Sequence, residues 1–143
     1  MSVEENKKIV RGYIEEVINT GNVDLIDKYI SADYTEIYEG KKYILGIDGA
    51  KEHIKGVRET YNNLNLTIDQ QIGENDYVVT SITARGIHNG KWMDIKPTGK
   101  PVLFTGVNVD KVVNGKIVEH GGAANLFGTL LEIGAIKIIK EDD

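Results

Sequence analysis

The chain has 143 residues, a length that fits one domain. Hydrophobic residues make up 41% and charged residues 27%, a balance typical of globular rather than disordered chains. The formal net charge is -5, and an acidic chain does not attract phosphate backbones, so nucleic acid is not expected as a partner. There are no cysteines, which excludes a disulfide framework, thiolate catalysis and cysteine-ligated metals.

The opening segment, Met1 to Lys8, has no basic stretch leading into an apolar run and does not resemble a signal peptide. No segment approaches the 18 or so apolar residues that a membrane span needs. We therefore expect a cytoplasmic protein without a membrane partner. Nothing resembles a linker or a repeat, so a single domain over 1–143 is expected, with an acidic tail, about 137–143, that frays.

The first part of the chain carries the signals of helices. Apolar residues recur at helical spacing after Ser2, and Ser2 and Glu5 together fit a capping box. Gly21 stands where a C-terminal cap would end this helix, and Asn22 and Asp48 can each cap a further one. The pattern predicts helices over 2–21, 22–29 and 48–61, with a brief extended piece at 34–38.

The second part changes to a period of two, which is typical of half-buried strands. Asn89-Gly90 and Asn114-Gly115 are strong hairpin signals between such segments. The pattern predicts strands over 64–68, 77–88, 102–113 and 116–124, followed by a short helix over 126–131. Helices followed by an antiparallel meander favour an α+β fold, with the helices packed on one face of a curved antiparallel sheet.

Several short motifs occur in a fixed order along the chain. They are Glu-Glu-Val-Ile-Asn-Thr-Gly21, Asp33-Tyr34, Lys96-Pro-Thr-Gly-Lys-Pro-Val102, Phe104-Thr-Gly106 and Asn114-Gly-Lys-Ile-Val-Glu-His120. This set resembles the SnoaL-like polyketide cyclases of the nuclear transport factor 2-like superfamily, from about Glu4 to Gly134. The resemblance implies a cone-shaped half barrel, covered by the N-terminal helices and enclosing one pocket, and a homodimer formed through the sheets. It also implies an intramolecular aldol cyclisation of a small hydrophobic carbonyl compound, without metal or cofactor.

The chain departs from the family pattern at four positions. The acid/base aspartate of the family corresponds to Asn125, and an amide does not exchange a proton at any useful pH. Ile37 stands where members tend to carry histidine, Gly121 where they tend to carry tryptophan, and Asn108 where they commonly carry aspartate. The resemblance therefore predicts the fold more firmly than the chemistry.

Four residues are candidates for catalysis. Asn125 either hydrogen-bonds a ligand carbonyl or caps the last helix. His120 titrates near neutral pH, but strand alternation places it on the face opposite Asn125 unless a bulge intervenes. His88 at a strand end and Asp94 beside Trp92 are either acid/base groups or plain surface.

His53 is expected to be solvated, and three scattered histidines without helical pairing do not predict a metal site. Side chains of the expected ligand pocket are either pocket lining or plain core. They are Tyr13, Tyr34, Ile37, Trp92, Phe104, Asn108, Gly121 and Asn125.

Three functions stay open at this level. The first is a cyclase or isomerase, which requires at least one His, Asp or Glu inside the cavity to replace the missing aspartate. The second is a binding protein that keeps the pocket without the chemistry. The third is a homodimeric interaction module whose cavity is filled by large side chains.

Overall fold

The computed structural model describes residues 1–91 and 94–141, which form helices followed by a six-stranded sheet. The helical elements are α1 (Val3–Gly12), η1 (Tyr13–Ile18), η2 (Val23–Lys28), α2 (Gly46–Thr60) and α3 (Phe127–Glu132). The strands are β1 (Ile30–Tyr38), β2 (Lys41–Ile44), β3 (Tyr61–Glu74), β4 (Tyr77–His88), β5 (Pro101–Val113) and β6 (Lys116–Ala124). Their order across the sheet is β2-β1-β6-β5-β4-β3.

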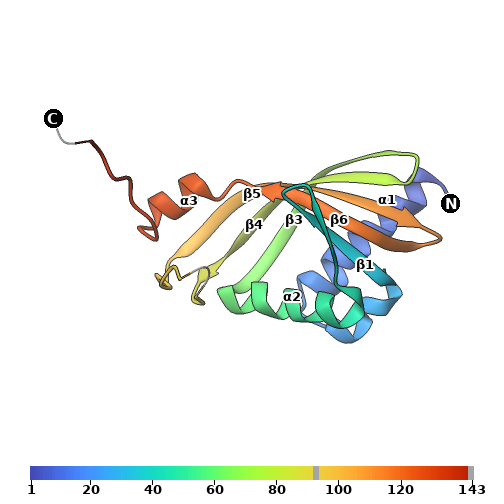
Figure 1. The fold of residues 1–143 in the computed structure, drawn as a ribbon, viewed down its shortest axis with the longest axis horizontal. Helices are drawn as coiled ribbons and strands as arrows, with labels where there is room; N and C mark the ends of the chain where they lie inside the picture. Colours follow the sequence, from blue (N-terminus) through green and yellow to red (C-terminus); the bar gives the residue numbers. More distant parts are fainter. Residues whose placement is uncertain (92–93, 142–143) are drawn as a thin grey trace.

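Neighbouring strands of the sheet are antiparallel except for β1 and β6, which are parallel. The parallel pair joins the N-terminal part of the chain to the last strand. Figure 1 shows α1 and α2 on one side of the curved sheet, with α3 following the end of β6. The fold is thus α+β, with a curved, unclosed sheet covered by the N-terminal helices, as the sequence predicts.

Most predicted elements are present, but several differ in bounds or type, among them the strand predicted over 64–68, which is Tyr61–Glu74. The strand that contains 34–38 begins earlier, at Ile30, and pairs with β2, which the sequence analysis did not predict. The third helix begins at Gly46, so Asp48 lies within its first turn and is not its cap. The first helix changes after Gly12 into the π-helix η1, in which Asn19 N donates to Ile14 O five residues earlier.

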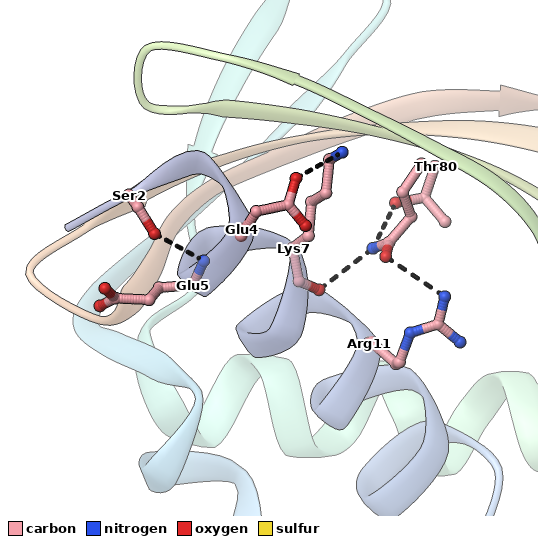
Figure 2. A network of polar contacts seen from close by, with 7 residues as sticks. Ser2, Glu4, Glu5, Lys7, Arg11 and Thr80 are labelled. Atoms are coloured by element: carbon pink, nitrogen blue, oxygen red, sulfur yellow. Dashed lines mark hydrogen bonds and ion pairs between the residues drawn. The ribbon is translucent and has the colours of Figure 1, made fainter.

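Helix α1 is fixed at its start and along its side. Ser2 Oγ accepts a hydrogen bond from Glu5 N at 3.1 Å, so the predicted N-cap is confirmed. Gln71 of β3 then ties the helix to the sheet, because its amide nitrogen donates to Lys7 O at 3.2 Å and its amide oxygen accepts from Arg11 at 3.4 Å. Figure 2 shows these contacts between the helix and the neighbouring strands.

The core lies between the helices and the concave face of the sheet. Alternate residues of β4, from Val78 to Ala84, point into it and are buried. From the helices, Val10, Ile14 and Val17 pack against them. Among the described helices, none is long and apolar enough to cross a membrane.

Candidate functional site

A cavity of about 330 Å³ lies between the concave face of the sheet and the helices η1 and α2. This volume falls in the range of small-molecule sites. Its apolar wall includes Ile54, Val57, Leu66, Ile82 and Phe104. The cavity stays open because β5 and β6 contribute residues with little or no side chain: Gly106, Gly121, Gly122, Ala123 and Ala124.

His120, which lines the cavity, pairs with the buried Asp110 behind it. The two residues face each other across the β5–β6 hairpin, and His120 Nδ1 lies 2.6 Å from Asp110 Oδ1. An ionised carboxylate only accepts hydrogen bonds, so Nδ1 carries the proton and Nε2 is left as the basic nitrogen. Asp110 is 2% exposed, which shields this contact from water.

The basic nitrogen of His120 is accessible from the cavity. Nε2 has no hydrogen bond within the described part of the chain, and no buried side-chain nitrogen or oxygen there lacks a partner. Nε2 is therefore not fully buried, and His120 is one of the residues that line the cavity. A histidine oriented by a carboxylate at one nitrogen, with the other nitrogen open, is a geometry suited to a general base.

The surroundings favour the protonated form of His120. Burial alone would lower its pKa, but the charge and hydrogen bond of Asp110 and the charge of Glu36 outweigh burial and raise the pKa above its ordinary value of 6.5. The residue is thus a stronger base than a free imidazole.

A second carboxylate–histidine pair lies beside the first. Glu36 stands next to His120 on the adjacent parallel strand, and its side chain accepts from Tyr34 Oη at 3.1 Å and contacts His53 Nδ1 at 3.0 Å. Burial would raise the pKa of Glu36, but these two contacts and the charges of both histidines lower it. Glu36 therefore stays ionised next to both histidines.

The π-helix η1, which brings Tyr13 to the cavity, is held in place by hydrogen bonds at its C-terminal end. Asn19, at its end, exchanges two hydrogen bonds with the backbone of Leu66, of 2.8 and 3.0 Å. Arg58 of α2 donates to the carbonyl oxygens of Ile18 and Asn19 at 2.9 and 3.1 Å. These contacts hold η1 against β3 and α2, and Tyr13, its first residue, lines the cavity.

Most predicted pocket residues line the cavity, and His120 lines it with them. These pocket residues are Tyr13, Tyr34, Ile37, Phe104, Asn108 and Gly121. Asn125 does not line it but is exposed and borders an adjoining shallow hollow with Asp69 and Ser81. Trp92 lies outside the described residues. The expectation that His120 and Asn125 lie on different faces agrees with this arrangement.

Two other catalytic candidates lie away from the cavity. His88 is 1% exposed, and its Nδ1 accepts from Thr98 N at 3.3 Å, so it fixes the loop after β4. Asp94 has a side chain that is 95% exposed and pairs with Lys91 at 3.3 Å. Neither residue therefore meets the polar cluster of the cavity.

The sequence analysis missed three residues of that cluster. His53 was expected to be solvated, but it lines the cavity because α2 crosses β1 at Glu36. Glu36 follows Asp33-Tyr34 within a motif but was not singled out. Asp110 is two residues after Asn108 on β5, and side chains two apart on a strand point to the same face, a signal that would have placed both together. In the part of the chain that the structure describes, no group of three or more His, Asp or Glu could hold a metal ion.

The curved sheet, the covering helices and the enclosed polar cluster define an α+β cone with a small-molecule cavity. The sequence pattern of the SnoaL-like polyketide cyclases matches residues 8–133, and the chain belongs to this family. It is 27% identical over 124 residues to the nogalonic acid methyl ester cyclase of Streptomyces nogalater, covering 81% of this chain and 88% of that protein.

Solved structures share the fold at lower identity. AclR of Streptomyces galilaeus, a proposed hydroxylase, superposes with a TM-score of 0.81 at 24% identity and covers 98% of this chain and 87% of its own. A proposed polyketide cyclase of Acidithiobacillus ferrooxidans superposes with a TM-score of 0.82 at 23% identity and covers 94% of this chain and 98% of its own. At these identities the likeness concerns the fold alone.

Proposed function

We propose that this protein is a cofactor-independent cyclase or isomerase of the intramolecular aldol type, acting on a small hydrophobic carbonyl compound. The observation that carries the proposal is the Asp110–His120 pair, whose free nitrogen opens onto a largely apolar cavity. The cyclase reading required a titratable group inside the cavity to replace the aspartate missing at Asn125. His120, held by Asp110, meets that requirement.

In the proposed reaction, His120 Nε2 takes a proton from the carbon next to a substrate carbonyl. The electron pair of the C–H bond forms the enolate, while Asp110 stabilises the imidazolium. The enolate carbon attacks a second carbonyl of the same molecule, and a C–C bond forms. The oxygen of that second carbonyl then receives the proton from His120. The product is an isomer of the substrate, so the reaction needs neither an oxidant nor a reductant.

The test follows proton abstraction directly, with deoxybenzoin as a hydrophobic ketone. Proton NMR in heavy water measures deuterium uptake at its CH₂ group. We expect the wild-type protein to accelerate the exchange and His120→Gln to reduce the acceleration by at least about 10²-fold, the usual contribution of a general base.

His88→Gln is the matched control, because it makes the same change at a histidine outside the cavity, and circular dichroism checks that both variants are folded. Equal exchange rates for the wild type and His120→Gln would refute His120 as the base. Saturable binding of deoxybenzoin without any exchange would favour the second function, a non-catalytic binding protein.

We also propose a homodimer formed through the outer face of the sheet. Leu103, Val107 and Val109 of β5 point away from the cavity and are 54%, 45% and 39% exposed. An exposed row of apolar side chains of this kind is typical of a surface that a second copy of the chain covers. Light scattering should give twice the chain mass for the wild type and for Ile44→Glu on β2, and the chain mass for Val107→Glu. A cytoplasmic location stays a prediction.

A further inference from the structure

Tyr13 carries a polar group that the proposed proton transfer leaves unused. Its ring is buried, with only 5% of the residue exposed, and packs against Tyr29 at 6.3 Å between ring centroids. Its hydroxyl makes no hydrogen bond to any described residue, and the described residues contain no buried polar side-chain atom without a partner. The hydroxyl must therefore open onto the cavity that Tyr13 lines.

Tyr13 and His120 line the same cavity. The charges of Glu36 and Asp110, the two carboxylates next to His120, both act on the Tyr13 hydroxyl. Together with burial, which is the larger cause, they raise the pKa of Tyr13 above its ordinary value. The group therefore keeps its proton at working pH and is available to donate a hydrogen bond to a ligand in the cavity.

Three other polar side chains of the cavity are less suited to this role. Tyr34 already directs its proton to Glu36, and His53 is engaged at Nδ1 by the same carboxylate. Asn108 lines the cavity but lies opposite Gly122, two residues along β5 from the Asp110–His120 pair. Tyr13 begins the π-helix whose other end is held by hydrogen bonds of Asn19 and Arg58.

We propose that Tyr13 is an oxyanion donor, whose hydroxyl hydrogen-bonds the substrate carbonyl oxygen as it becomes an enolate. This inference rests on the proposed function and adds a second catalytic residue to it. When His120 removes the proton, the C–H electron pair becomes the C=C bond of the enolate, and the former C=O pair moves onto the oxygen. Charge then develops on that oxygen, and a preorganised donor in a water-poor site stabilises it. On protonation of the product, the charge is lost and Tyr13 keeps its own proton throughout.

The test uses para-nitrophenol, whose ionised oxygen mimics the enolate, and nitrobenzene, which has the same shape without that oxygen. Binding is followed by absorbance and by calorimetry. We expect the wild-type protein to prefer para-nitrophenol, and Tyr13→Phe to lose about 10-fold in its affinity while nitrobenzene binding is unchanged.

Tyr29→Phe is the matched control, since it removes a hydroxyl that contacts Glu16 outside the cavity. It should bind both compounds as the wild type does. The proposal is overturned if Tyr13→Phe binds para-nitrophenol within twofold of the wild type, or if the wild type shows no saturable binding.

Deoxybenzoin exchange separates this proposal from the proposed function. Tyr13→Phe should slow exchange by about 10²-fold, the cost of removing one oxyanion donor. If His120→Gln abolishes exchange but Tyr13→Phe keeps both exchange and affinity, only the tyrosine proposal fails. If Tyr13→Phe loses para-nitrophenol affinity while His120→Gln exchanges normally, the donor stands and the base must be another group.

Discussion

Asp110 lies opposite His120 because β6 contains one extra residue near its start. From the Asn114-Gly115 turn the strands pair in simple register as far as Val112 and Ile117, and then Lys111 pairs with Glu119. The residue skipped between them is Val118, and without this bulge Asp110 would face Glu119. The bulge therefore turns His120 to the inner face and completes the pair.

The first prediction concerns Asp110→Asn. Without the carboxylate, the pKa of His120 should fall, because the charge and hydrogen bond that raise it are lost. Deuterium uptake by deoxybenzoin requires neutral His120, so in the wild type the rate should rise with pH through the raised pKa. In Asp110→Asn the midpoint should move to lower pH, and the maximum rate should fall by about 10²-fold or more because the ring loses its orientation.

Proton NMR of the His120 ring and the pH–rate profile give two independent readings of this shift. Unchanged midpoints in both would contradict the assigned pairing. Asp69→Asn, at an exposed carboxylate outside the cavity, serves as the control.

The second prediction concerns stability and pH. Since the pKa of His120 is higher in the folded state, the folded protein binds more protons than the unfolded chain between 6.5 and the raised value. The contribution of His120 to the free energy of unfolding should be complete below pH 6.5 and disappear as pH rises through the raised pKa. Urea denaturation of the wild type should show this loss, and His120→Gln should not.

Glu36 should act in the opposite sense and in a different range. Its pKa is lowered, so its contribution is present above its ordinary value of 4.5 and is lost as pH falls through the lowered value. In Glu36→Gln this acid-side loss of stability should be smaller than in the wild type. An identical decline in both proteins would contradict the contacts assigned to Glu36.

The third prediction concerns Gly122, at the bend of β6. Its φ is +147°, which disfavours any side chain, and a Cβ there would collide with the carbonyl oxygen of Val107. Gly122→Ala should therefore destabilise the protein by about 2–4 kcal/mol in chemical denaturation. Gly56→Ala is the control: Gly56 lies within α2, a Cβ added there would meet no neighbouring atom, and alanine should stabilise the protein by up to about 1 kcal/mol. Equal effects of the two changes would refute the strain at Gly122.

The fourth prediction compares the two asparagines for which the resemblance predicts an aspartate in the family, Asn108 and Asn125. Asn108 lines the cavity and Asn125 does not. Asn108→Ala should weaken deoxybenzoin binding by about 5–10-fold, the worth of one hydrogen bond, and Asn125→Ala should leave binding and exchange unchanged. Isothermal calorimetry measures both. A larger loss for Asn125→Ala would place the ligand near the shallow hollow rather than in the cavity.

The sequence by itself determined the elements and the family. Alternation from Tyr77 to His88 and the Asn-Gly turns define the strands, because side chains of a strand alternate between faces and few residues tolerate a tight turn. The ordered motifs from Asp33-Tyr34 to His120 carried the resemblance that the family match confirms. Most of the pocket lining followed from these two signals.

Only the tertiary structure decided which side chains meet in the cavity. His120 faces Asp110 because of a bulge at Val118, and no glycine or proline at this position indicates the bulge in the sequence. Glu36 reaches both histidines because β1 pairs in parallel with β6 and because α2 crosses beside it. Strand register and helix crossing depend on contacts between residues far apart in the chain, and such contacts leave no periodic signal in the local sequence.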